Sequence, residues 1–143
     1  MVLVHGTTVA IEGKGVLLRG PSGSGKSDLA LRLIDRGAVL VADDQTRLSE
    51  ADGRLAAAAP PSIAGLIEVR GIGIVRLDYA AGVPLALVVD LVAGARVERL
   101  PPAVFASFLG IAVPLIALDP FEGSAMAKVR LAALSPTRDI MRS

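Results

Sequence analysis

Residues 16–37 read VLLRGPSGSGKSDLALRLIDRG, a short apolar run followed by a glycine-rich turn and an amphipathic segment. The turn matches G-x-x-x-x-G-K-S, the pattern of a phosphate-binding loop. Glycines at these spacings let successive backbone N–H groups turn inward around nucleotide phosphates. The lysine then reaches the β- and γ-phosphate oxygens, and the serine hydroxyl holds a magnesium ion. We therefore predict a nucleotide site formed by Gly20, Pro21, Ser22, Gly23, Ser24, Gly25, Lys26 and Ser27.

The segments on both sides of the loop favour this interpretation over a glycine–serine turn with chance spacing. An apolar, strand-like run at residues 16–18 precedes the loop. After it, Leu29 and Leu33 recur at helical spacing, and Gly37 fits the position just beyond a helix end. We predict a strand, the loop and then a helix over residues 27–36.

The second strong signal is an acidic pair at the end of a predicted strand. Residues 38–42 form a continuous apolar run, typical of a buried strand, that ends abruptly at Asp43-Asp44. Ligands of such α/β sheets gather beyond the carboxyl ends of the strands, so Gly20 and the acidic pair should face one pocket. Neighbouring residues of an extended chain point to opposite sides, which suggests that one aspartate holds magnesium and the other meets the incoming nucleophile. The alternative is a turn aspartate beside a solvated one, which the preceding phosphate loop disfavours.

Composition restricts the class of protein. The 143 residues predict one domain, and a hydrophobic content of 52% with a mean hydropathy of +0.60 argues against disorder. A net charge of +1 without a basic stripe predicts no nucleic-acid partner. The absence of cysteine suits the cytoplasm and excludes thiolate chemistry.

The most apolar stretch, residues 104–118, is shorter than the ~20 residues that cross a bilayer, and the N-terminus lacks a basic signal region. We expect a soluble cytoplasmic protein without a membrane partner, whose excess apolar surface serves an oligomer interface.

Several further elements are expected along the chain. Residues 2–4 and 7–11 predict a hairpin that turns back near Gly13 and Gly15, and residues 46–48 and 54–57 predict an edge hairpin around Asp52-Gly53. Apolar runs predict strands at 85–91 and 115–118. A helix is predicted from Pro101-Pro102 to Gly110, with Val104, Phe105, Phe108 and Leu109 on one side. A last helix is expected at 123–134, which closes a catalytic domain over residues 1–134, and a tail at 135–143.

Three further sites are ambiguous from pattern alone. In Glu68-Val69-Arg70-Gly71-Ile72-Gly73, Glu68 and Arg70 alternate with apolar neighbours on one predicted strand face, and either a magnesium ligand or a simple exposed ion pair fits the spacing. His5, the only histidine, fits a structural or an exposed role at least as well as a catalytic one. Arg99 reads as a surface residue before a helix.

A family resemblance covers roughly residues 3–118. The set His5-Gly6, Gly20 to Ser27, Val41-Ala42-Asp43-Asp44 and Glu68 to Ile74 resembles the catalytic domain of HPr kinase/phosphorylase, in the same order and at similar spacings. The resemblance implies an α/β fold of the PEP-carboxykinase-like type, with a mainly β-sheet core flanked by helices around one P-loop kinase site. It also implies ATP and Mg²⁺ as cofactors, phosphorylation of a serine of the phosphocarrier HPr in a bacterial phosphotransferase system, and a homo-oligomer of hexameric form.

The resemblance assigns roles residue by residue. Lys26 matches the lysine of the loop, and Asp44 matches the base that accepts the seryl proton. His5 and Arg99 match catalytic-site residues. Magnesium ligands are expected at Ser27, Asp43 and Glu68.

The chain departs from the family near its C-terminus. A Pro- and Arg-bearing segment that serves dephosphorylation in the family corresponds here to residues 113–122, which contain no arginine and two acids, Asp119 and Glu122. Because inorganic phosphate needs positive charge to bind, we expect the forward kinase reaction and not the reverse phosphorylase reaction. The alternatives to this function are a small-molecule P-loop kinase and a non-catalytic ATP-sensing regulatory module.

Overall fold

The computed structural model of the chain describes residues 1–135 and 140–141. Two α-helices and eleven strands are present in these residues, together with two short 3₁₀ helices, η1 and η2. In chain order the elements are β1 (Val2–His5), β2 (Thr7–Ile11), β3 (Lys14–Arg19), α1 (Lys26–Asp35), β4 (Val39–Ala42), β5 (Gln45–Ala51), β6 (Arg54–Ala58), η1 (Pro61–Ile63), β7 (Leu66–Val69), β8 (Gly73–Arg76), β9 (Val83–Leu91), η2 (Gly94–Arg96), β10 (Val104–Phe108), β11 (Ile111–Leu118) and α2 (Ala125–Leu134).

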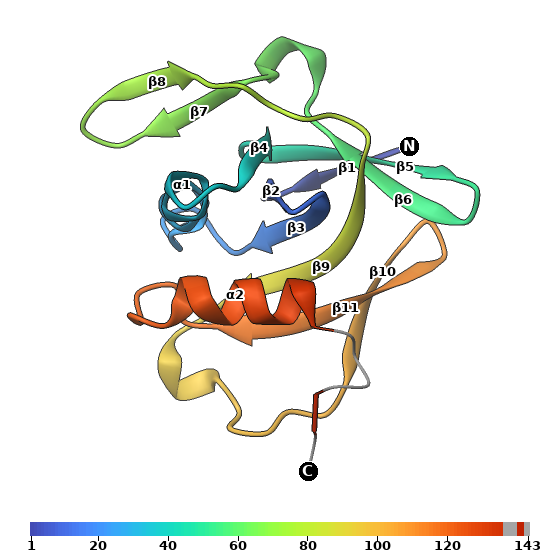
Figure 1. Cartoon of the computed structure of the whole chain (residues 1–143), viewed down its shortest axis with the longest axis vertical. Coiled ribbons are helices and arrows are strands. Elements are labelled where there is room, and N and C mark those ends of the chain that lie inside the picture. The colour runs from blue at the N-terminus through green and yellow to red at the C-terminus, as the bar shows by residue number, and fades with distance from the viewer. Residues whose placement is uncertain (136–139, 142–143) are drawn as a thin grey trace.

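Nine of the described strands form one mixed sheet with the order β1-β5-β6-β9-β3-β2-β4, to which β11 and β10 are added beside β9 (Figure 1). Strands β3 and β11 both run parallel to β9. Strand β2 is antiparallel to β3 and to β4, so β3 and β4 also share a direction. The carboxyl ends of β3, β4, β9 and β11 therefore lie at one edge of the sheet, which is where the phosphate loop begins.

Side chains alternate between two cores on the two faces of the sheet, as the pleat of a strand requires. On the helical face, Val16 and Leu18 of β3 pack in one buried cluster with Leu29 and Leu33 of α1 and with Val129 of α2. On the other face, β3, β5, β6, β9, β10 and β11 supply a second cluster, which contains Leu17, Leu48, Leu55, Val88, Ala106 and Val113. The mixed, sheet-dominated α/β architecture with two flanking helices confirms the predicted fold class.

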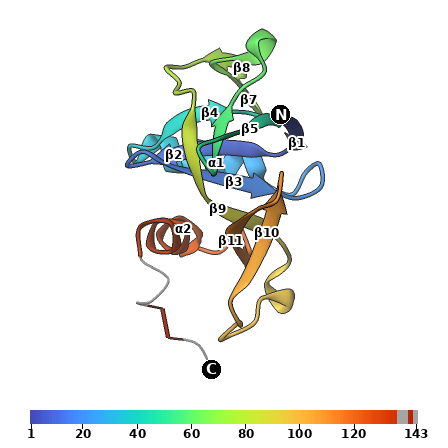
Figure 2. The same ribbon diagram turned by 90° about the vertical axis from the view of Figure 1, so that its right-hand side faces the viewer.

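The hairpin β7–β8 stands apart from the large sheet, above α1 in Figure 1 and at the top of Figure 2. Ile67 of β7 is only 1% exposed and packs in the buried cluster on the helical face of the sheet. At the far end, Ile72 and Ile74 are 78% and 74% exposed. Arg70 lies in the turn of this hairpin, so the prediction that Glu68 and Arg70 share one strand face was wrong. Register brings Val69 opposite Gly73, which leaves residues 70–72 to make the turn.

The helix predicted from Pro101 to Gly110 was wrong. The structure has strand β10 there, paired antiparallel with β11 from Val104 opposite Leu115 to Phe108 opposite Ile111. Leu109 and Gly110 have φ values of 51° and 78°, the left-handed pair of a tight hairpin turn rather than a helix end. β-branched and aromatic residues favour this pairing, and the neighbouring strand outweighs the helical spacing of the apolar side chains.

The pairing of the N-terminal strands also differs from the prediction. Strand β2 forms its hairpin with β3 through the Glu12-Gly13 turn, whereas β1 pairs with β5, so β1 and β2 form no hairpin with each other. The β5–β6 hairpin exists around Asp52-Gly53, but it lies between β1 and β9 and is not at an edge. The predicted strands at 85–91 and 115–118 are present as β9 and β11, and the predicted helices at 27–36 and 123–134 are present as α1 and α2, each within a few residues.

Neither helix is long and apolar enough to cross a membrane within the residues that the structure describes. Residues 136–139 and 142–143 of the tail predicted at 135–143 lie outside the described residues.

Candidate active site

The phosphate loop links the end of β3 to the start of α1. Gly23 and Gly25 have φ values of 81° and 100°, which only glycine adopts without strain, and the Ser24 N–H donates to the carbonyl of Pro21 at 3.0 Å. The first helical bond runs from the Leu29 N–H to the Gly25 carbonyl at 2.9 Å. The N–H groups of the first helical turn therefore have no partner inside the helix, and such a helix start suits the binding of an anion.

Lys26 is buried at the base of the loop. Its side chain is 7% exposed, and Nζ donates to the carbonyl oxygens of Gly20 at 2.7 Å and Pro21 at 3.1 Å. Nearby, the Ser24 hydroxyl is buried and has no hydrogen-bond partner among the described residues. A cationic group and an unsatisfied hydroxyl in one tight loop fit the phosphate-binding role predicted for Gly20 to Ser27.

Asp43 connects the loop to the rest of the site. Its carboxylate is buried and accepts hydrogen bonds from the hydroxyls of Ser27 at 2.7 Å and Thr7 at 3.0 Å. The other carboxylate oxygen accepts the N–H of Glu68 at 3.0 Å. The predicted proximity of the phosphate loop and the acidic pair is confirmed, because Ser27, in the first turn of α1, bonds to Asp43, which follows β4.

Asp44 lies next to Asp43 but is exposed. Its φ of 67° turns the chain, and its side chain is 66% exposed. The carboxylate lies 3.0 Å from Nε2 of His5, and the backbone N–H donates to the Thr7 hydroxyl at 3.1 Å. The two aspartates therefore occupy different environments, a buried carboxylate beside the loop and an exposed one beside a histidine. The left-handed bend at Asp44 separates them, and not the alternation of an extended strand that was predicted.

Three buried threonines connect the chain near His5-Gly6 with the chain near Asp43-Asp44 through hydrogen bonds. The sequence analysis predicted a role for none of them. Thr7, Thr8 and Thr46 are each 0% exposed. The hydroxyls of Thr8 and Thr46 lie 2.8 Å apart, and Thr46 donates to the Gly6 carbonyl at 3.0 Å. The Gly6 N–H donates in turn to the Asp44 carbonyl at 2.8 Å. The sequence does contain a hint of their role. Two polar residues, Thr7 and Thr8, begin an otherwise apolar strand directly after His5-Gly6, and Thr46 lies two residues after Asp44.

The remaining predicted site residues are less closely placed. The Glu68 side chain is exposed, and only its backbone reaches Asp43. No group of three or more His, Cys, Asp or Glu side chains poised for a metal occurs among the described residues. Arg99 lies in the exposed loop between η2 and β10 and makes no hydrogen bond or ion pair in the part of the chain that the structure describes. The structure therefore brings together His5, Ser27, Asp43 and Asp44, but not Arg99.

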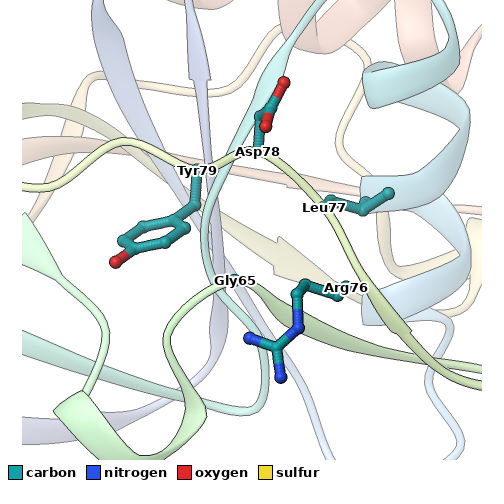
Figure 3. A pocket seen from close by; sticks show the side chains of 5 residues that line it. All are labelled: Gly65, Arg76, Leu77, Asp78 and Tyr79. Carbon is teal, nitrogen blue, oxygen red and sulfur yellow. The ribbon is translucent and has the colours of Figure 1, made fainter.

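A separate hollow of about 600 Å³ lies where the hairpin β7–β8 leads into β9 (Figure 3). Gly65, Arg76, Leu77, Asp78 and Tyr79 line it, and it shares no residue with the phosphate loop or the acidic pair. The side chains of Arg76 and Tyr79 extend to one side of the chain and Asp78 to the other (Figure 3). With no converging polar groups, the hollow is not the candidate active site.

Comparison with known proteins gives one consistent result. The family model of the HPr Serine kinase C-terminal domain matches residues 1–133. The HPr kinase/phosphorylase of Bordetella petrii is 38% identical over 94% of this chain and 47% of the relative. That of Clostridium botulinum (strain Eklund 17B / Type B) is 43% identical over 59% of this chain and 28% of the relative. The chain thus spans half or less of the length of these curated relatives. The solved structure of the Hpr(Ser) kinase/phosphatase from Coxiella burnetii superposes with a TM-score of 0.81 and 29% identity, over 92% of this chain and 88% of that one.

Proposed function

The chain belongs to the family of HPr serine kinase C-terminal domains, and we propose that it is the catalytic unit of a kinase that transfers the γ-phosphoryl group of ATP to a serine of HPr. The names of its relatives supply the substrate, since both curated relatives carry HPr in their names. The observation that carries the proposal is the 2.7 Å hydrogen bond from Ser27 to Asp43, which joins the phosphate loop to the acidic pair at one edge of the sheet.

The residues at this edge fit the two cofactors. Backbone N–H groups of the loop and the Lys26 ammonium suit the phosphates of ATP. The hydroxyl of Ser27 and the carboxylate of Asp43 are the hard oxygen ligands that Mg²⁺ prefers, and Glu68 would add a third from the tethered hairpin. When bound there, Mg²⁺ neutralises charge on the phosphate oxygens.

The transfer itself needs a base at the acceptor hydroxyl, and we assign that role to Asp44. Asp44 removes the seryl proton as the seryl oxygen bonds to the γ-phosphorus, and the bond between that phosphorus and the β–γ bridging oxygen breaks to leave ADP. The exposed carboxylate is accessible to a protein substrate, and His5 holds it from one side at 3.0 Å. The role proposed for Arg99 rests on the family resemblance alone.

We propose that the reaction runs in the forward direction. The loop after β11 carries Asp119 and Glu122 and no arginine. Glu122 pairs with Lys128 at 2.6 Å, which leaves the Asp119 carboxylate to disfavour the inorganic phosphate that a phosphorylase reaction needs. We further propose one catalytic unit over residues 1–134, a cytoplasmic location and a homo-oligomeric, hexameric state. Sedimentation of the purified protein tests the last of these.

The experiment that tests the function incubates the protein with Mg-ATP and HPr and measures a phosphate mass increase on a serine of HPr. The Asp44→Asn variant should still bind Mg-ATP but lose about 10²–10⁴-fold in transfer rate, the range for general-base help. Equal transfer by this variant would remove Asp44 from the mechanism. Transfer only to small molecules would indicate a metabolite kinase, and ATP binding without any transfer would indicate a sensing module. Phosphoserine-HPr incubated with inorganic phosphate tests the reverse reaction, which should be absent.

A further inference from the structure

An aromatic side chain lies against the phosphate loop without being part of any core. Phe121 follows β11 and is 72% exposed. A Cβ built on Gly25, the glycine before Lys26, would lie 3.3 Å from Cζ of Phe121 and 3.3 Å from Cγ of Pro120. The tip of the ring therefore lies beside the loop at Gly25, while most of the residue's surface remains open to solvent.

The segment that carries Phe121 is held in place from several sides. Arg32 of α1 donates to the carbonyl of Pro120 and also pairs with Asp28 at 3.2 Å. The Phe121 N–H donates to the Asp119 carboxylate at 2.9 Å, and Glu122 pairs with Lys128 of α2 at 2.6 Å. These bonds hold the backbone of the segment, so the ring projects from a defined place beside the phosphate loop.

The ring lies at the edge of the sheet where the phosphate loop begins. Strands β3 and β11 both run parallel to β9, so the phosphate loop and the loop after β11 leave the sheet at the same edge. A nucleotide whose phosphates lie on the loop must extend its ribose and base past that loop. Every base has an apolar face, and an exposed aromatic ring offers a flat surface on which such a face stacks.

The charges around Phe121 are mixed. Asp119 and Glu122 lie on either side of Pro120-Phe121, but Glu122 pairs with Lys128 at 2.6 Å and Arg32 donates to the Pro120 carbonyl. The feature that favours an uncharged base is therefore the exposed apolar ring and not the local charge.

We propose that Phe121 stacks on the adenine base of the nucleotide that the phosphate loop holds, and so selects ATP over a polyphosphate without a base. This inference rests on the proposed function, because it takes ATP as the ligand of the loop. It names a specificity-determining residue for that ligand, on a segment about one hundred residues away from the loop along the chain.

The test compares two ligands by isothermal titration calorimetry in the presence of Mg²⁺: ATP and inorganic tripolyphosphate, which lacks the base. Phe121→Ala should bind ATP about 5- to 150-fold more weakly, the effect expected of a lost base–aromatic stack, and should bind tripolyphosphate as the wild type does. Phe121→Tyr keeps the ring and should restore ATP affinity, whereas Phe121→Leu keeps only apolar bulk and should not. Lys26→Ala should weaken both ligands and serves as the control for the phosphate part of the site.

Each other result has a definite meaning. Unchanged ATP affinity in Phe121→Ala, or an equal loss for ATP and tripolyphosphate, overturns the proposal. A changed oligomeric mass with an unchanged ratio of the two affinities also overturns it and assigns the ring to a subunit contact. If the wild-type protein binds tripolyphosphate and ATP equally well, the stacking inference fails while the phosphate loop stands. If it binds neither, the proposed function fails as well.

Discussion

Replacing Thr7 by valine removes one hydroxyl from the candidate site while keeping the shape of the side chain. That hydroxyl donates to the Asp43 carboxylate at 3.0 Å and accepts the Asp44 N–H at 3.1 Å, and the residue is 0% exposed. The variant loses a bond to a charged group and leaves a backbone N–H without its partner. Net of the added methyl group, we expect the free energy of unfolding to fall by roughly 2–4 kcal/mol. Urea denaturation measures this as a lower midpoint with an unchanged slope.

The same substitution should affect phosphotransfer more than nucleotide binding, because both aspartates lose a contact that orients them while the loop is untouched. We expect the transfer rate at saturating ATP to fall at least tenfold, since small misplacements of catalytic groups cost about that much or more, with the Kd for Mg-ATP nearly unchanged. Thr7→Ser keeps the hydroxyl and should restore the rate. Thr8→Val loses a neutral bond to Thr46 that touches neither carboxylate, and should lower stability without a comparable loss of rate. A Thr7→Val protein with the urea midpoint and transfer rate of the wild type would refute the positioning role.

Three further substitutions test other parts of the site. Lys26→Ala should weaken Mg-ATP binding and slow transfer, measured by calorimetry and by phosphorylation of HPr; unchanged binding would contradict the role of the loop. In Asp43→Asn, the Glu68 N–H meets either the neutral amide oxygen or the amide NH₂, which is a second donor. The free energy of unfolding measured in urea should therefore fall by roughly 1–3 kcal/mol, and Mg²⁺-dependent phosphotransfer should be lost. Gly6→Ala would bring a Cβ to 2.8 Å from the Leu18 carbonyl oxygen, and the backbone shift that relieves this clash should lower the free energy of unfolding by roughly 1–3 kcal/mol. A melting curve like that of the wild type would contradict this expectation.

The arrangement of the acidic pair explains why two adjacent carboxylates can differ in function. Asp43 follows β4 and accepts hydrogen bonds from three donors, whereas Asp44 has a φ of 67° and its carboxylate lies beside His5. The left-handed conformation costs a non-glycine residue about 1–3 kcal/mol, which the hydrogen bond from its N–H to Thr7 helps to offset. A strained residue at the reacting position is typical of functional sites.

Local sequence patterns predicted the elements whose structure depends on neighbouring residues. The loop glycines, the helical spacing of Leu29 and Leu33, and Gly37 as the helix end all act within a few residues, and α1 lies over Lys26–Asp35 as expected. The same reasoning failed for residues 101–110, where apolar residues at helical spacing are also good strand residues. Pairing with β11 decided between the two, and a single sequence does not reveal that pairing.

The sequence by itself determined the phosphate loop, the acidic pair and the direction in which both must face, because these follow from backbone conformations and strand ends set by short stretches of chain. Only the tertiary structure decided which groups complete the site. Thr7 lies 36 positions from Asp43, Glu68 lies 25 positions from it, and Phe121 reaches Gly25 from the other end of the chain. Such contacts depend on the order in which strands pair, and that order is set by the packing of the whole sheet rather than by any local stretch.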